Sequence, residues 1–369
     1  MAAGQRRSRV TAHERERDDD PEEEAAGRRH DERVTGHVGP PRSSLPETWH
    51  VADALLERYG LDAVSIEPVA GGQDAQARVY RVATRDPDAR YLVKVRPADA
   101  ARDVAAVVTR HLHETGARHV VAPVQPRAGK KPEPGFALTV SPFVDGRTGV
   151  EAGLSDRRWR ELGAFTRRLH ATVPPSSVVG LLGTETYRPT EIDLVRRIDA
   201  ELAGQTSPSG AAGDAAALWS ARRDTILALA ERTEELGRQL ARRALPLVLC
   251  HADLHTWNVV VDAAGELWVV DWDEAVLAPK ERDLMFVVGG ISARLVTPQA
   301  TKAFFAGYGE TTIDEPALAY YRHAWAIQDI GSYAQQALHG EERPEAARIF
   351  ASLFEPGEIV AIAEVSLGE

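Results

Sequence analysis

The 369-residue sequence has one cysteine, Cys250, so the chain cannot form an intramolecular disulfide. Chains without disulfides are typical of a reducing compartment. No apolar run approaches the length of a membrane span, and the N-terminal residues are charged where a secretory signal would be apolar. From these absences we expect a soluble, cytoplasmic protein that does not bind a membrane.

The chain also has fewer basic than acidic residues, 44 against 55, which gives a net charge of −11. An acidic protein is a poor match for the phosphates of nucleic acid, so we expect no nucleic-acid partner. The charge is compatible with a small cationic ligand, although many cytoplasmic proteins are acidic without binding one. Hydrophobic residues make up 43% of the chain, which suits two packed lobes rather than one.

The first 44 residues contain nine Arg and ten Asp or Glu, with few apolar side chains and no periodicity. Such a segment buries too little surface to offset the entropy lost on ordering. Residues 1–44 are therefore predicted to be a disordered tail. A dispensable extension is the expectation, and a functional tail is the alternative.

Two motifs at a fixed separation contain the polar residues expected of a catalytic site. Asp253 is followed five residues later by Asn258, and Asp271 stands at the end of an apolar run. Between them, residues 259–261 and 267–270 have the pattern of a two-stranded hairpin, which would bring Asn258 and Asp271 together. Phosphoryl transfer from a nucleotide needs a carboxylate that activates a hydroxyl, and hard oxygen ligands for Mg²⁺.

These residues resemble the motifs of the aminoglycoside phosphotransferases, relatives of the protein kinases, and are most similar to those of the spectinomycin phosphotransferases. The similarity to that subgroup rests on residues 271–286, which begin Asp-Trp-Asp-Glu, and on residues 307–310 and 320–323. The resemblance extends roughly from Trp49 to the C-terminus. Its specific part is the catalytic core.

The resemblance implies an α+β, bilobal, protein-kinase-like fold. Residues 45–143 would form a small N-terminal lobe with an antiparallel sheet that binds the nucleotide. Residues 144–369 would form a larger, mainly helical C-terminal lobe with the catalytic and substrate-binding residues. In the strand order of this family, the third strand carries the Lys that contacts the α- and β-phosphates, and Lys94 has this place in the apolar strand 91–95.

Other nucleotide contacts are assigned by position. Gly71 and Gly72 would form the hairpin loop over the phosphates. The helix at 98–113 lacks a Glu in its first half, so Asp103 is the best-placed acid to pair with the Lys, with Glu114 second. The connector between the lobes would offer backbone groups to the adenine. The residues expected to hold ATP are Lys94, Asp103, Gly71, Gly72, Ser141, Phe143 and Val144.

By the same resemblance, Asp253 orients and deprotonates the acceptor hydroxyl, and Asn258 and Asp271 bind Mg²⁺. Aromatic and acidic side chains would suit a cationic aminocyclitol. Asp273 stands where many relatives have Gly, so a structural role is its alternative. Trp325 is a weaker candidate, because a Trp in a helix is usually part of the core. The substrate residues predicted are Trp257, Asp273, Glu274 and Asp329.

The sequence thus predicts an ATP- and Mg²⁺-dependent phosphotransferase that modifies a hydroxyl of spectinomycin or a related aminocyclitol or aminoglycoside antibiotic and so inactivates it. A kinase of the same fold with another small acceptor, such as an amino alcohol, a sugar or a peptide antibiotic, is the first alternative, because fold does not fix substrate. A non-catalytic nucleotide-binding regulator is the second. Such regulators usually lose the base or a metal ligand, and this chain retains both.

Overall fold

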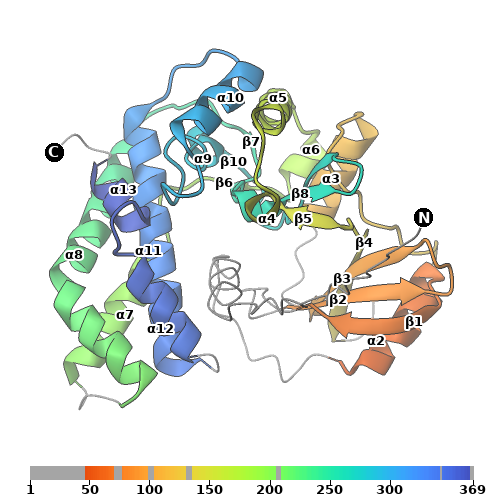
Figure 1. Cartoon of the computed structure of the whole chain (residues 1–369), viewed down its shortest axis with the longest axis horizontal. Helices are drawn as coiled ribbons and strands as arrows, with labels where there is room; N and C mark the ends of the chain where they lie inside the picture. The colour runs from red at the N-terminus through yellow and green to blue at the C-terminus, as the bar shows by residue number, and fades with distance from the viewer. Residues whose placement is uncertain are drawn as a thin grey trace, which may run out of the picture.

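The computed structural model of the chain describes residues 46–69, 77–98, 104–129, 135–204, 209–340 and 343–365. The predicted tail, residues 1–44, lies outside these ranges. Within the described ranges, no helix is both long and apolar enough to span a membrane. A sheet with one flanking helix forms one end of the molecule, and long helices form the other (Figure 1).

The small lobe contains a four-stranded antiparallel sheet in the order β1-β2-β3-β4. Its strands are β1 (Ala63–Pro68), β2 (Arg78–Thr84), β3 (Arg90–Pro97) and β4 (Phe136–Pro142). Helix α2 (Thr48–Ala54) continues into the π-helical turn η2 (Leu55–Tyr59), and Val51 and Leu55 pack into the core of this lobe. Because strand residues alternate between faces, Val93 and Val95 point into the same core while Lys94 points away from it.

Two three-stranded sheets lie between the small lobe and the long helices. One has the order β5 (Gly146–Thr148), β8 (Val259–Asp262), β9 (Leu267–Val269), and the other β6 (Gly183–Thr184), β10 (Val276–Ala278), β7 (Val248–Cys250). Val260 lies opposite Trp268 in the antiparallel pair β8–β9, which confirms the predicted hairpin. Four short helices accompany these strands: α4 (Gly149–Ala152), α6 (Ser176–Val179), η4 (Thr256–Asn258) and α9 (Glu281–Leu284).

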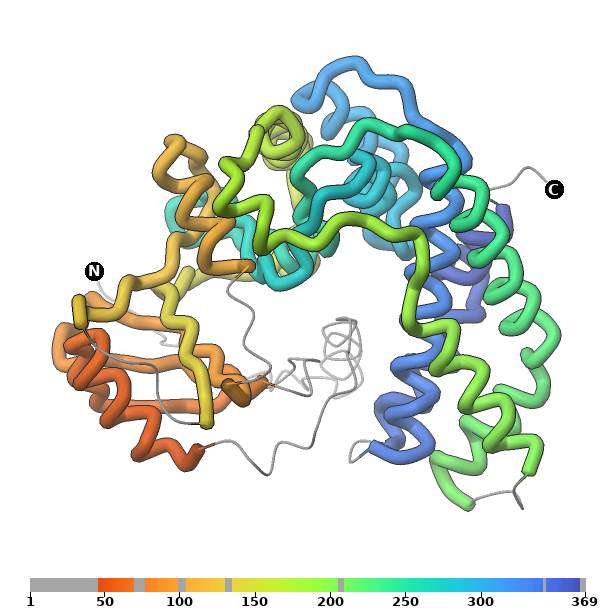
Figure 2. The backbone as a smooth tube through the Cα atoms, turned by 180° about the vertical axis from the view of Figure 1, so that it is seen from behind, coloured from red at the N-terminus to blue at the C-terminus, as the bar shows by residue number. Residues whose placement is uncertain are grey.

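The larger lobe is built from helices around α11 (Glu315–His339), most of whose residues are buried. Its other long helices are α5 (Asp156–Ala171), α7 (Glu191–Gly204), α8 (Ala211–Leu240), α10 (Pro298–Tyr308), α12 (Arg343–Ser352) and α13 (Ile359–Val365). Apolar side chains recur every three or four residues in them, as Trp159, Leu162, Phe165 and Leu169 do in α5, and this face is buried. Seen from behind, α7, α8, α11 and α12 stand together, opposite the sheet (Figure 2).

Helices α5 and α10 cross so closely that two glycines are required at the contact. A Cβ on Gly307 would lie 1.9 Å from the carbonyl oxygen of Arg160, and a Cβ on Gly163 would lie 2.0 Å from that of Phe304. Both obstacles are backbone atoms, which cannot turn away as a side chain can. This crossing matters for the site, because α5 carries His170, which contacts Asp283 below the catalytic loop.

Helix α3 (Val104–Glu114) packs on the larger lobe. Val108 and Leu112 belong to the hydrophobic core of that lobe, and Val120, after the helix, bridges to Val269 of β9. Part of the segment assigned by sequence to the first lobe therefore contributes to the core of the second. The lobe boundary at residue 143 stays a prediction.

Candidate active site

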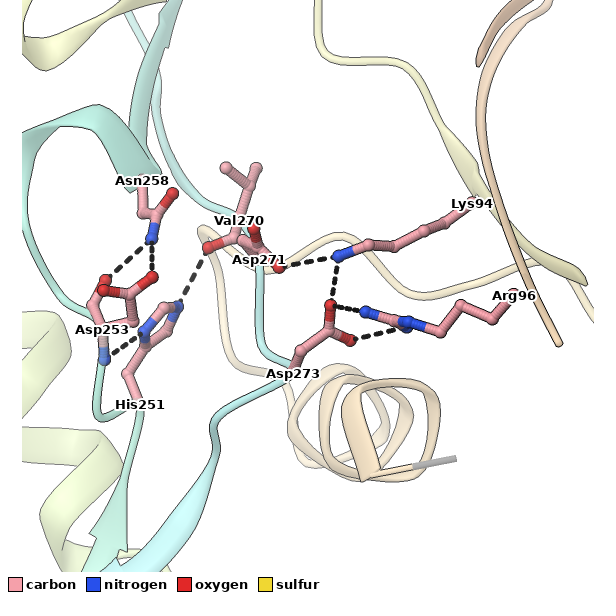
Figure 3. Close-up of polar contacts among 8 residues, drawn as sticks. All are labelled: Lys94, Arg96, His251, Asp253, Asn258, Val270, Asp271 and Asp273. Atoms are coloured by element: carbon pink, nitrogen blue, oxygen red, sulfur yellow. Dashed lines mark hydrogen bonds and ion pairs between the residues drawn. The ribbon is translucent and has the colours of Figure 1, made fainter. Parts of the chain in front are cut away.

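The loop between β7 and β8 carries Asp253, whose side chain is buried. Its Oδ2 accepts a hydrogen bond of 2.7 Å from Nδ2 of Asn258, and its backbone oxygen accepts a second of 2.9 Å from the same amide (Figure 3). His251 donates from Nε2 to the carbonyl of Val270 (2.9 Å) and accepts at Nδ1 from the backbone of Asp253 (3.3 Å). Burial lowers the pKa of His251, which agrees with this neutral tautomer. His251 thus ties the loop to the hairpin.

The second oxygen of Asp253 lies beside another histidine. His255 Nε2 is 3.2 Å from Asp253 Oδ1, and both side chains are almost fully buried. Burial alone would raise the pKa of Asp253, but the positive charge of the neighbouring His255 holds it below its ordinary value. The carboxylate is therefore ionised at neutral pH, as a proton acceptor must be. Sequence reasoning missed His255.

Asp283 anchors the backbone of the loop that carries Asp253. Its Oδ1 accepts from the backbone N–H of Ala252 (2.7 Å), and its Oδ2 accepts from the N–H of His251 and from Nε2 of His170, both at 3.0 Å. Ala252 has φ 67°, a left-handed conformation that an Ala adopts at a cost of about 1 kcal/mol or more. Asp283 and His170 lie close enough to Cys250 to resemble a metal site, but both Asp283 oxygens already accept these hydrogen bonds. We therefore regard Asp283 as a structural anchor.

The two predicted metal ligands meet at the open end of the hairpin. The N–H of Val270 donates to the backbone oxygen of Asn258 (3.0 Å), and Asp271 follows directly with φ 60°. Lys94, on β3 of the small lobe, places Nζ 3.3 Å from Asp271 Oδ1. The structure therefore brings Lys94, Asn258 and Asp271 to one place, with Asp253 beside them.

The donor set fits a hard divalent cation. Asn258 uses its NH₂ on Asp253, and within the described ranges its Oδ1 accepts no hydrogen bond. Lys94 lowers the pKa of Asp271, but burial and the neighbouring Asp273 carboxylate act against it and raise the value to about 6. The carboxylates of Asp271 and Asp273 repel each other, and the amide oxygen of Asn258 is available as a ligand. Mg²⁺ bound at such a place would relieve the repulsion.

Asp273 occupies a different place from the one expected. Its Oδ2 contacts Nζ of Lys94 and lies 2.6 Å from Nη2 of Arg96, while its Oδ1 lies 3.4 Å from Nη1 (Figure 3). The predicted substrate residue thus faces the small lobe, and the substrate role stays a prediction. Sequence reasoning missed Arg96, although its position two residues after Lys94 puts both side chains on one face of β3.

The remaining nucleotide assignments lie at the edge of the sheet or outside the described ranges. Ser141 is the partner of Leu92 in the β3–β4 pair. The N–H of Phe143 donates to the carbonyl of Arg90 (2.9 Å), so this group is engaged in the sheet, and Val144 follows it half-buried. Glu114, the second choice for the acid, is exposed at the far end of α3. Gly71, Gly72 and Asp103 lie outside the described residues.

Aromatic side chains pack around His255 on the side of the larger lobe. The ring of Trp257 lies 5.4 Å from His255, and that of Trp325 lies 6.3 Å from it. Nε1 of Trp257, Nε1 of Trp325 and the hydroxyl of Tyr321 are buried without a hydrogen-bond partner in the described part of the chain. Buried donors without a partner are uncommon in folded proteins, and a ligand or a water molecule can satisfy these three.

A guanidinium, also missed by sequence reasoning, lies over these aromatics. Arg282 Cζ is 5.7 Å from the ring centroids of both Tyr321 and Trp325, and no ion pair to it is present among the described residues. Burial would lower its pKa, but Glu185 and Glu274 are near enough to raise it, so Arg282 stays charged. Asp329, one turn beyond Trp325 in α11, is buried at 5% exposure.

A buried carboxylate, an Asn and an Asp at the ends of one hairpin, and a Lys from a separate sheet form the residue set of a kinase-like phosphotransferase. The model of the phosphotransferase enzyme family matches residues 65–350, and the chain belongs to this family. It is an enzyme that transfers a phosphoryl group to a hydroxyl, as predicted from the sequence.

Solved structures agree with this assignment. A spectinomycin phosphotransferase in complex with ADP and spectinomycin is 28% identical, with 86% of this chain and 98% of that chain covered and a TM-score of 0.77. An AMP-bound complex of spectinomycin phosphotransferase has the same identity and coverage with a TM-score of 0.74. Choline kinase from Streptococcus pneumoniae, 16% identical over 83% of this chain and 99% of that chain, shares the fold with a TM-score of 0.53. No curated protein matches the sequence. The predicted α+β, bilobal, kinase-like fold is confirmed.

Proposed function

We propose that the enzyme transfers the γ-phosphoryl group of ATP to one hydroxyl of spectinomycin or a closely related aminocyclitol, and thereby inactivates the antibiotic. The observation that carries the proposal is the similarity to spectinomycin phosphotransferase over 86% of the chain, at 28% identity and a TM-score of 0.77. The unsatisfied donors of Trp257 and Trp325, whose rings pack on His255, support it. We also assign the reaction to the cytoplasm, where ATP is abundant.

In the proposed reaction, Asp253 is the base. Its carboxylate takes the proton of the acceptor hydroxyl as the oxygen attacks the γ-phosphorus and ADP leaves. Asn258 holds Oδ2 of this carboxylate at 2.7 Å and His255 lies 3.2 Å from Oδ1, so the base is fixed before the acceptor arrives.

The phosphates are held by other groups. Lys94 extends from β3 toward Asp271, where it is placed to contact phosphate oxygens. Asn258 and Asp271 would hold Mg²⁺, which, when bound, neutralises the charge on the phosphates. We retain Ser141, Phe143 and Val144 as the proposed adenine contacts, through backbone groups other than the engaged N–H of Phe143.

The acceptor side combines two kinds of partner. The indole N–H groups of Trp257 and Trp325 need oxygen acceptors, which the ether, carbonyl and hydroxyl oxygens of a rigid fused aminocyclitol provide. Glu274 and Asp329 are the proposed partners for its ammonium groups. Arg282 adds a positive charge beside them, which disfavours acceptors with three or more ammonium groups such as kanamycin.

The test is a panel of acceptors at fixed MgATP, with kcat/KM measured for spectinomycin, kanamycin, choline and ethanolamine. Spectinomycin is expected to be preferred over each of the others by at least about 100-fold, since rejected acceptors leave buried groups unpaired. Preference for choline or ethanolamine would keep the phosphotransferase assignment and overturn the acceptor. ATP hydrolysis without any phosphorylated acceptor in the panel would also overturn it.

A further inference from the structure

Lys94 is held by a carboxylate that does not come from helix α3. In the described part of the chain its ammonium contacts only Asp271 and Asp273, and the Asp273 contact is the shorter. Both carboxylates belong to the loop after β9, 177 and 179 residues away in sequence. We propose that Asp273, itself fixed by Arg96, is the residue that positions Lys94 for the nucleotide phosphates, in place of an acid on α3.

Arg96 makes Asp273 suitable for this role. The guanidinium binds both Asp273 oxygens, at 2.6 and 3.4 Å, from the same face of β3 that carries Lys94. The side chains of Lys94, Arg96 and Asp273 are only 17%, 11% and 20% exposed, so water screens these ion pairs weakly. Asp273 thus lies between two cationic side chains, Lys94 and Arg96, and contacts both.

Helix α3 presents no described acid that could compete. From Val104 to Glu114 its sole carboxylate is Glu114, which is exposed at the last position of the helix. Val108 and Leu112 are directed into the core of the larger lobe. The described part of α3 is thus used for packing.

The arrangement also affects the metal site. Asp273 holds Lys94 on one side, so the contact of the ammonium with Asp271, at 3.3 Å, is the longer of the two. Without the Asp273 charge, Lys94 would pair with Asp271 alone and compete with Mg²⁺ for it. The pair Arg96–Asp273 also joins β3 of the small lobe to the catalytic loop region of the larger one, and so helps to set the distance between the lobes (Figure 3).

This inference rests on the proposed use of a nucleotide, and its test needs no acceptor. ADP is titrated calorimetrically into the parent, Asp273→Asn, Asp273→Glu and Arg96→Met, with and without Mg²⁺. Because a charge-assisted contact to Lys94 is lost, Asp273→Asn should weaken ADP binding roughly tenfold or more without Mg²⁺ and raise the Mg²⁺ concentration needed for half-maximal binding. Asp273→Glu should restore most of the affinity, and Arg96→Met should give a smaller loss.

The matched control is Asp62→Asn, which removes the exposed ion pair of Asp62 with Arg85 (2.6 Å) at another edge of the same sheet and should leave ADP binding unchanged. Melting temperatures of the ligand-free proteins identify variants that do not fold. If Asp273→Asn fails to fold, the ADP affinities of Asp273→Glu and Arg96→Met test the inference in its place. ADP affinity equal to the parent's in the folded variants would overturn the inference.

Discussion

At the scale of single residues, the site depends on a carboxylate that is buried and still charged. Asp253 is 3% exposed, a situation that normally favours the neutral acid. The charge of His255 reverses that preference. The contact with His255 and the hydrogen bond from Asn258 also fix the orientation of the carboxylate.

The variant Asp253→Asn should therefore lose turnover while keeping its fold. An amide cannot accept the hydroxyl proton, and loss of general-base catalysis typically lowers kcat by about 10²–10⁴-fold. Steady-state kinetics and ADP titration measure the two effects separately, and ADP affinity should stay near that of the parent. Turnover within a few-fold of the parent would remove Asp253 from the role of base.

Trp325→Phe tests the acceptor side. The variant loses the unsatisfied indole N–H but keeps an aromatic ring against Phe286, whose centroid lies 4.9 Å away. We expect the KM for spectinomycin to rise roughly five- to tenfold, the usual effect of one hydrogen bond, with ADP affinity unchanged. An unchanged acceptor KM would mean that this N–H faces no acceptor oxygen.

At the scale of elements, the catalytic loop depends on helices that are distant in sequence. Helix α5 supplies His170 and α10 supplies Tyr308, whose hydroxyl is 2.9 Å from His170 Nδ1. His170 in turn contacts Asp283, which holds the loop through Ala252 and His251. The crossing of α5 and α10 is therefore part of the support of the active site.

Gly307→Ala should disturb that support. The added Cβ would meet the Arg160 carbonyl at 1.9 Å, so the helices must separate, at an expected cost of about 1–3 kcal/mol in the free energy of unfolding. Denaturant unfolding measures it, and Gly204→Ala, whose Cβ meets nothing within 4 Å, is the matched control. Equal stability of the two variants would show that the crossing adjusts freely.

At the scale of the whole molecule, local patterns are enough to predict much of the architecture. The hairpin β8–β9 follows from two short β-branched runs around a turn, so the amino-acid sequence by itself predicts that Asn258 and Asp271 lie close together. The α5 helix follows from the spacing of Trp159, Leu162, Phe165 and Leu169. The role of Lys94 and the kinase-like form of the fold follow from the family resemblance, whereas composition indicates only that the chain suits two lobes.

Contacts between distant segments could not be predicted in this way. The contact of Asp273 with Lys94 and Arg96 depends on how the two lobes face each other, which no local pattern encodes. The same holds for Arg282 over Tyr321 and Trp325, and for α3, which packs on the larger lobe. The sequence places His255 two residues after Asp253, so its proximity could have been predicted. The orientation of its ring depends on contacts with Trp257 and Phe286 and could not.

Deletion of residues 1–44 belongs to this scale as well. The segment has few apolar side chains to contribute to either hydrophobic core, so its removal should change neither the melting temperature nor kcat/KM. Differential scanning calorimetry and steady-state kinetics of the truncated protein check this expectation. A clear fall in melting temperature would show that the tail contacts the body of the protein.

The central claim is that this enzyme phosphorylates spectinomycin with Asp253 as the base. It is tested most directly by mass spectrometry of spectinomycin after incubation with MgATP and either the parent enzyme or Asp253→Asn. We predict that the parent adds the mass of one phosphoryl group to nearly all of the spectinomycin, while the variant leaves it unchanged over the same period. Unmodified spectinomycin with the parent enzyme, or equal conversion by the variant, would contradict the claim.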